Sequence, residues 1–127
     1  MILIDTCGWI EWLTNGPLAD RYETFFQDAT QSVVPTSVQF ELYKWVARMD
    51  GKQQALEAVA LTEQSKIMPL STSIALLAAD LSLAHQLSFA DAIIYATAQF
   101  SRAELITSDS HFEGLRGVTF FSKEQGK

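Results

Sequence analysis

The sequence predicts an α/β fold with a central parallel sheet of about four or five strands flanked by helices. Short apolar segments alternate along the chain with longer segments of helical periodicity, which is typical of parallel sheets. The length of 127 residues, 48% of them hydrophobic, suits one domain that buries about two thirds of its unfolded surface. No stretch of linker composition divides the sequence. We therefore expect residues 1–127 to form a single domain.

In the N-terminal half, glycine and proline mark where the helices end. The expected elements are a strand over residues 2–4, helices over 8–13 and 18–30, a strand over 32–35, and helices over about 36–49 and 52–64. The segment Asn15-Gly16-Pro17 stops the first helix, and Asp50-Gly51 separates the last two. Thr36 or Ser37 offers an N-cap to the third helix.

In the C-terminal half, serines mark where the helices begin. The expected elements are a weaker strand over residues 66–69, helices over about 74–85 and 89–100, a strand over 104–107, a helical turn near 110–115 and a strand over 118–122. Ser71 or Ser73 caps the first helix, and Ser88 starts the second. This second helix is apolar almost all round, which predicts a place in the core.

Four acids stand at the boundaries of these elements. Asp5 and Asp109 directly follow predicted strands, and Glu41 and Asp91 lie early in predicted helices. Ligand sites of parallel sheets lie outside the carboxyl ends of the strands, where Asp5 and Asp109 fall. Two carboxylates ~5 Å apart repel by roughly 3 kcal/mol at an effective dielectric of ~20, so converging acids need a counter-charge. We predict a shared cation.

Each acid also has a purely structural explanation. Asp5 and Asp109 suit helix caps, Asp91 matches a capping box that begins at Ser88, and Glu41 suits an exposed helix face. Capping does not explain why acids follow both an early and a late strand with helical acids between them. The metal site and the separate caps both stay open on the sequence alone.

Oxygen ligands select Mg²⁺, with Mn²⁺ as a substitute. His85 and His111 lack the spacing of a zinc site, and we expect both to be ordinary helix or surface residues. Cys7, the one cysteine, is expected to be a small buried residue. The net charge of −6 disfavours an extended nucleic-acid footprint, although four metal-binding acids would account for most of it.

Four motifs carry a family resemblance. They are Asp5-Thr6-Cys7-x-Trp9, Pro35-Thr36-Ser37-x-x-x-Glu41-Leu42, the run from Leu87 through Ser88, Asp91 and Tyr95 to Ala98, and Leu105-Ile106-Thr107-Ser108-Asp109 with Phe112 three residues later. In order, spacing and length, the chain resembles the PIN-domain family, and within it the VapC-type toxin ribonucleases. Ser108 departs from the pattern, because the family often has a basic residue there.

The resemblance implies a PIN-like three-layer fold and a Mg²⁺-dependent endoribonuclease, the toxin of a type II (VapBC-like) toxin-antitoxin pair. Asp5, Glu41 and Asp91 would then be metal ligands, and Asp109 would complete the site or orient the attacking water. Thr6 would support Asp5, and Thr107 would add a hydroxyl to the site, although strand-end hydrogen bonding explains both threonines equally well.

Further candidates concern the partners. Lys44 and Arg48 share a helix face with Glu41 and would hold RNA phosphates, unless that face is simply solvated. Trp9 and Trp12 belong to the core or line a hydrophobic groove, which the resemblance assigns to a small antitoxin. The resemblance also implies a homodimer.

Location and alternatives complete the prediction. No apolar run reaches the ~18 residues of a membrane span, and no secretory signal is visible, so we expect a cytoplasmic protein. The alternatives are a housekeeping PIN nuclease for RNA processing and a catalytically inactive binding module. A receiver-like signalling domain is disfavoured because its first strand should end in adjacent acids, whereas Thr6 follows Asp5.

Overall fold

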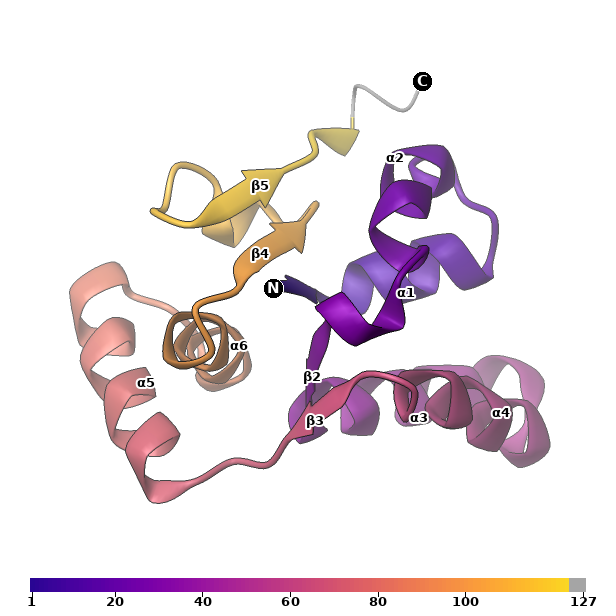
Figure 1. Cartoon of the computed structure of the whole chain (residues 1–127), viewed down its shortest axis with the longest axis horizontal. Coiled ribbons are helices and arrows are strands. Elements are labelled where there is room, and N and C mark those ends of the chain that lie inside the picture. Colours follow the sequence, from indigo (N-terminus) through magenta and orange to yellow (C-terminus); the bar gives the residue numbers. More distant parts are fainter. Residues whose placement is uncertain (124–127) are drawn as a thin grey trace.

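The computed structural model describes residues 1–123 and has the predicted α/β organisation (Figure 1). The strands are β1 (Ile2–Ile4), β2 (Val33–Pro35), β3 (Lys66–Met68), β4 (Glu104–Thr107) and β5 (Val118–Phe120). The helices are α1 (Thr6–Leu13), α2 (Ala19–Glu23), α3 (Thr36–Asp50), α4 (Lys52–Thr62), α5 (Thr72–His85) and α6 (Phe89–Phe100).

All strand pairs are parallel, as the alternation of strands and helices predicts. The strands β1, β4 and β5 form one hydrogen-bonded sheet in the order β1-β4-β5, and β2 pairs with β3 in a second. A lone parallel bridge between Ile2 and Ser32 connects the two sheets. The expected strands therefore exist, but continuous hydrogen bonding is interrupted between β1 and β2.

Helices cover both faces of the strands. Figure 1 shows α5 and α6 on one side and α1, α2, α3 and α4 on the other, which gives the three layers. Helix α6 packs against β2 and β4, and every residue from Ala92 to Ala98 is buried. The all-round apolar sequence of this segment therefore does mark the central helix of the core.

The predicted helix over residues 18–30 is wrong in its extent. Helix α2 ends at Glu23, and two 3-10 turns follow, Thr24–Phe26 and Ala29–Gln31. No helix reaches Thr30, because Asp28 has extended backbone angles and its carboxylate accepts a hydrogen bond from the Thr30 backbone N–H at 3.0 Å. A short polar side chain that bonds its own backbone competes with the helical ladder.

The expected cap of α3 is also wrong. The helix begins at Thr36 itself, and Pro35 occupies the N-cap position with extended backbone angles. Proline fixes φ near the value that suits the end of a strand and lacks an N–H that would need a partner.

Within residues 1–123, no single helix is long and apolar enough to cross a membrane. Only α5 and α6 taken together reach that composition, and they meet at an angle of 115°.

Candidate active site

The site is built at the carboxyl ends of β1 and β4. These strands are adjacent and parallel, with Ile4 in register with Ile106, and the Asp5 backbone N–H donates to the Ile106 carbonyl at 3.0 Å. Asp5 and Thr107 therefore lie side by side as their strands end. Asp109 follows two residues later and starts a 3-10 turn over Ser110–Phe112.

Asp5 is the buried acid of the group, with only 5% of its surface exposed. Its Oδ1 accepts from the Thr6 backbone N–H and its Oδ2 from the Thr107 hydroxyl, each at 2.8 Å. Burial raises the pKa of Asp5 to about 6, against the lowering effect of those two hydrogen bonds. The negative charges of the Asp109 and Glu41 carboxylates raise this pKa further, to a smaller extent.

The two threonines connect Asp5 to its neighbours. The Thr107 hydroxyl accepts from the Asp109 backbone N–H at 2.9 Å while it donates to Asp5, so it ties the two acids together. The Thr6 hydroxyl donates to Glu41 Oε1 at 2.7 Å. Thr6 thus contacts Asp5 through its backbone N–H and Glu41 through its hydroxyl.

His111 connects the last two acids. Its Nδ1 lies 3.0 Å from Asp91 Oδ2 and 3.3 Å from Asp109 Oδ1. The hydrogen bond to Asp91 and the negative charges of both acids raise the pKa of the imidazole. The side chain is 69% exposed, so His111 is a surface residue as predicted, and it also contacts two of the four acids.

A local contact explains why His111 turns toward the acids. The carboxylate of Asp109 accepts from the His111 backbone N–H at 3.0 Å, in a tight turn of the kind that aspartate favours. Phe112, the next residue, is fully buried and holds the turn to the core. The signal in the sequence was the short Asp109-x-His111 spacing, which differs from the histidine spacing of a zinc motif.

The contacts form one continuous chain. It runs through Glu41, Thr6, Asp5, Thr107, Asp109, His111 and Asp91. The structure thus brings all four predicted acids into one network. The capping explanation also holds for two of the acids, because the carboxylate of Asp5 caps α1 and that of Asp109 caps the 3-10 turn. For Asp91 the cap is the Ser88 hydroxyl, which accepts from the Asp91 backbone N–H at 3.2 Å, while the Asp91 carboxylate contacts His111.

The donor set fits a divalent cation. Asp91, Asp109 and His111 each offer one ligand atom, and these atoms all lie within 4.8 Å of one another. Two carboxylate oxygens supply the hard, charged donors that Mg²⁺ and Mn²⁺ prefer. A hollow of about 310 Å³ lies beside Asp91 and His111.

Ser108, where the motif departs from the family pattern, is buried against Cys7. It is 4% exposed, and its hydroxyl donates to the Cys7 sulfur at 3.5 Å. Cys7 is half-buried and its sulfur also lies 3.5 Å from the Thr107 hydroxyl. A buried serine at this position gives the interior a small polar contact beside Asp5, in place of a cationic side chain.

The outlying candidates lie on two different surfaces. Lys44 and Arg48 are exposed on α3, the helix that carries Glu41, and Lys44 Nζ lies 5.8 Å from the centre of the Phe40 ring. Trp9 and Trp12 lie on α1, with Trp9 buried and Trp12 half-buried. Trp9 is thus part of the core and also of a groove.

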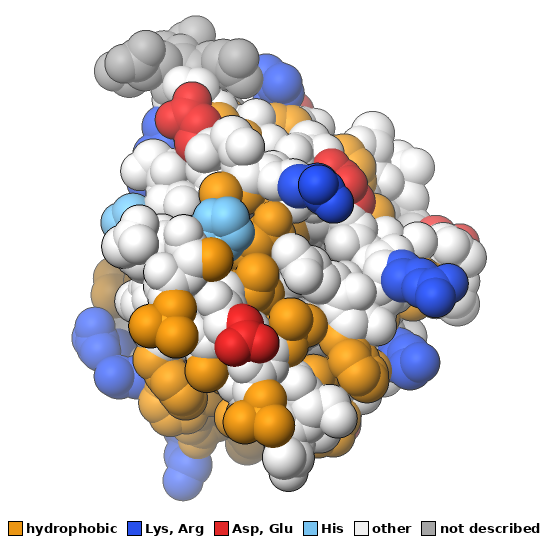
Figure 2. Space-filling model, turned by 90° about the vertical axis from the view of Figure 1, so that its left-hand side faces the viewer, with side chains coloured by type: hydrophobic (Ala, Val, Ile, Leu, Met, Phe, Trp, Pro, Cys, Tyr) orange, Lys and Arg blue, Asp and Glu red, His pale blue; other side chains and the backbone are white. Residues whose placement is uncertain are grey.

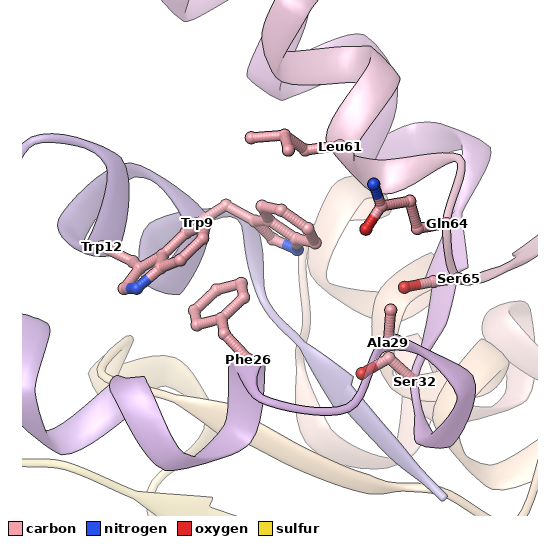
Figure 3. A pocket seen from close by; sticks show the side chains of 8 residues that line it. All are labelled: Trp9, Trp12, Phe26, Ala29, Ser32, Leu61, Gln64 and Ser65. Atoms are coloured by element: carbon pink, nitrogen blue, oxygen red, sulfur yellow. The ribbon is translucent and has the colours of Figure 1, made fainter.

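The groove lies between α1, the 3-10 turns and the end of α4 (Figure 3). It measures about 50 Å³ and is lined by Trp9, Trp12, Phe26, Ala29, Ser32, Leu61, Gln64 and Ser65. The Trp12 ring stacks on Phe26 at 4.2 Å between ring centroids, and its indole N–H donates to Glu23 at 2.6 Å. The indole N–H of Trp9 is buried and has no hydrogen-bond partner among the described residues. The groove therefore combines the aromatic surface of Trp12 and Phe26 with the unpaired indole N–H of Trp9.

Comparison with known proteins agrees with this architecture. The family model of the PIN domain matches residues 2–118. A toxin-antitoxin complex from Klebsiella pneumoniae contains a chain that is 27% identical, with a TM-score of 0.80 over 94% of this chain and 96% of that one. No curated protein sequence matches at a significant level.

Two more distant structures share the fold. The VapC20 toxin of Mycobacterium tuberculosis, described as cleaving the sarcin-ricin loop, is 17% identical with a TM-score of 0.69 over 96% of this chain and 90% of its own. VapBC2 of Rickettsia felis, bound to a promoter DNA fragment, is 16% identical with a TM-score of 0.72 over 95% of this chain and 98% of its own. Fold and site thus define a PIN domain. The chain belongs to the PIN-domain family, as its motifs predicted.

Proposed function

We propose that this protein is a metal-dependent endoribonuclease and the toxin of a type II, VapBC-like toxin-antitoxin pair. The observation that carries the proposal is the unbroken chain of contacts that joins Glu41, Asp5, Asp109 and Asp91. Family membership supports a nuclease, and the Klebsiella toxin-antitoxin complex and the VapC20 toxin support the toxin class and an RNA substrate. We take residues 1–127 as one nuclease domain that acts in the cytoplasm.

The roles of the residues follow from their positions. Asp91, which lines the hollow, and Asp109, which is grouped with it around His111, are metal ligands, and the carboxylates of Asp5 and Glu41 add negative charge beside them. A bound Mg²⁺, or Mn²⁺ in its place, supplies charge neutralisation at the scissile phosphate and lowers the pKa of a water. The Thr107 hydroxyl fixes the Asp5 carboxylate relative to Asp109, and the Thr6 hydroxyl fixes Glu41. The protein thereby fixes the positions of the ligands before substrate binds.

Lys44 and Arg48 are proposed to bind RNA phosphates beside this site. Both side chains are exposed and follow Glu41 by three and seven residues on α3, so the three share one helix face. Cations on this face would offset the repulsion between RNA and a protein of net charge −6.

The Trp9–Trp12 groove is proposed as the antitoxin site. The Klebsiella, Rickettsia, Salmonella typhimurium and Haemophilus influenzae neighbours are described as toxin-antitoxin or VapBC structures, which supports a small antitoxin partner. The partner's apolar side chains would cover Trp12, which is half-buried and forms part of the groove wall. Trp12→Ala should weaken antitoxin binding, whereas Leu56→Ala, an exposed apolar change on α4, should leave it unchanged.

A homodimer is proposed to form through α5 and α6. Figure 2 shows hydrophobic side chains gathered over the face that these helices cover. The exposed apolar side chains of this face include Leu76 and Leu83 on α5 and Phe89 and Phe100 on α6. The spacings of seven and eleven residues place the members of each pair on one side of their helix. Leu83→Asp, at a side chain 80% exposed, should yield monomers in sedimentation experiments if this face is the interface.

Cleavage assays test the nuclease proposal. Wild-type protein freed of metal should cleave RNA only after Mg²⁺ or Mn²⁺ is added. Asp91→Asn should abolish cleavage without loss of fold, and Asp80→Asn, an exposed acid on α5, is the matched control. Full cleavage in excess chelator, or equal activity of Asp91→Asn and wild type, would exclude this mechanism.

The toxin assignment has a separate test. Expression of the wild-type chain should arrest growth, and coexpression of a small protein encoded next to it should restore growth. Harmless high expression of an active nuclease would instead favour the housekeeping PIN nuclease. Harmless expression of a chain that neither cleaves RNA nor binds metal would favour an inactive binding module.

A further inference from the structure

We propose that His111 supplies a nitrogen ligand to the divalent cation and makes the site prefer Mn²⁺ over Mg²⁺. This inference rests on the proposed function, because it concerns the cation of the same site. It changes the expectation from oxygen ligands alone, which favoured Mg²⁺.

The separations of His111 Nδ1 from the two carboxylate oxygens suit one octahedral cation. At ligand distances of about 2.1 Å, adjacent ligands of an octahedron lie about 3 Å apart. His111 Nδ1 lies 3.0 Å from Asp91 Oδ2 and 3.3 Å from Asp109 Oδ1, which are separations of this size. His111 Nδ1 therefore already stands at the separation of an adjacent ligand from each carboxylate, while the Asp91 and Asp109 oxygens lie within 4.8 Å of each other.

The imidazole is held in place by its own turn. The Asp109 carboxylate accepts from the His111 backbone N–H, and the Phe112 backbone N–H donates to the Asp109 carbonyl at 3.1 Å. Phe112 is fully buried, so the turn is anchored on one side. The His111 side chain is 69% exposed, which leaves water free to fill the other positions around a cation.

The ligand chemistry of imidazole decides the preference of the site between Mn²⁺ and Mg²⁺. Mg²⁺ favours oxygen ligands and gives up its water reluctantly, whereas imidazole nitrogen suits transition metals. A ligand set of two carboxylates and one imidazole therefore favours Mn²⁺. Replacing the nitrogen should reduce the affinity for Mn²⁺ by about 10- to 100-fold, the range seen when even an outer partner of a metal ligand is lost. The affinity for Mg²⁺ should change much less.

The experiment measures binding of each metal without RNA. Full-length protein freed of metal is titrated with MnCl₂, with free Mn²⁺ followed by electron paramagnetic resonance, and separately with MgCl₂ by calorimetry, at one fixed pH. His111→Asn should lose Mn²⁺ affinity selectively. His85→Asn is the matched control, because His85 lines the same hollow but is not one of the three grouped ligands.

A spectroscopic measurement distinguishes a ligand from a positioning residue. Pulsed electron paramagnetic resonance of bound Mn²⁺ should show coupling to a histidine nitrogen in wild type and in His85→Asn, and none in His111→Asn. Labelling with ¹⁵N-histidine should alter the wild-type signal, so the test stands even if His111→Asn does not fold. Absence of nitrogen coupling in wild type, or equal loss of Mn²⁺ and Mg²⁺ affinity in His111→Asn, would overturn the proposal.

The two proposals fail in different ways. Nitrogen coupling in a protein that cleaves no RNA would leave the Mn²⁺ site standing and remove the nuclease function. Cleavage that needs Asp91 but shows no nitrogen coupling would leave the nuclease standing and remove the role of His111.

Discussion

Replacing Asp5 by asparagine should abolish cleavage and, in the metal-free protein, also remove a pH-dependent loss of stability. Burial raises the pKa of Asp5 from 3.8 to about 6. Each pKa unit corresponds to about 1.4 kcal/mol, so a carboxylate at this position costs the metal-free folded state about 3 kcal/mol at neutral pH.

The direction of the stability change with pH follows from proton binding to Asp5. Between pH 3.8 and about 6, folded protein keeps a proton on Asp5 that the unfolded chain has released. The free energy of unfolding therefore falls as pH rises through this window, and the full loss is reached above pH of about 6. The asparagine side chain carries no titrating group, so the Asp5→Asn variant should not show this part of the decline.

Hydrogen bonding sets the part of the stability difference between wild type and Asp5→Asn that does not depend on pH. Asp5 accepts from both the Thr6 N–H and the Thr107 hydroxyl, whereas an amide has a single acceptor oxygen. One donor is left without its acceptor, which costs about 1–3 kcal/mol at every pH. Asp5→Asn should thus be the less stable protein near pH 4 and equal or more stable near pH 7.5. The difference between the two proteins should change by about 3 kcal/mol across the window.

Urea unfolding of protein freed of metal, measured at pH 4 and pH 7.5, tests this expectation. Asp80→Asn, an exposed acid on α5, should follow wild type at both values. The reasoning would be refuted if the stability difference between wild type and Asp5→Asn changed by less than about 1 kcal/mol between the two pH values.

Three further predictions concern the same site. Thr107→Val removes the hydroxyl between Asp5 and Asp109, so RNA cleavage should fall and the free energy of unfolding should drop by about 1–3 kcal/mol. Thr97→Val, which removes a hydroxyl hydrogen bond inside α6, is the control and should keep its cleavage activity. Cation at about 100 times its dissociation constant should stabilise wild type by about 2.7 kcal/mol in thermal unfolding, and Asp91→Asn should show a clearly smaller gain. Replacing both Lys44 and Arg48 by Gln should weaken RNA binding and make it less dependent on salt concentration, whereas Lys52→Gln, at the start of α4, should change neither. An equal salt dependence in wild type and both variants would show that Lys44 and Arg48 only form a solvated helix face.

Periodicity and motif order were sufficient for most of the fold. The apolar segment from Ala92 to Ala98 identified the central helix because burial on all sides requires apolar residues on all sides. The largest error was local, over residues 18–30, where the Asp28 carboxylate accepts from the Thr30 backbone N–H and starts a new turn. The periodicity of apolar residues cannot predict this break, because it results from one side-chain hydrogen bond that competes with the helical hydrogen bonds.

The amino-acid sequence alone placed the four acids at the ends of strands and the starts of helices, because those boundaries follow from apolar runs, caps and breakers. Only the tertiary structure decided how these acids meet. The pairing of β1 with β4 sets Thr107 against Asp5, and the turn at Asp109 directs His111 toward Asp91. Side-chain contacts between residues far apart in the chain depend on strand register and on turn geometry, which no pattern along the chain encodes.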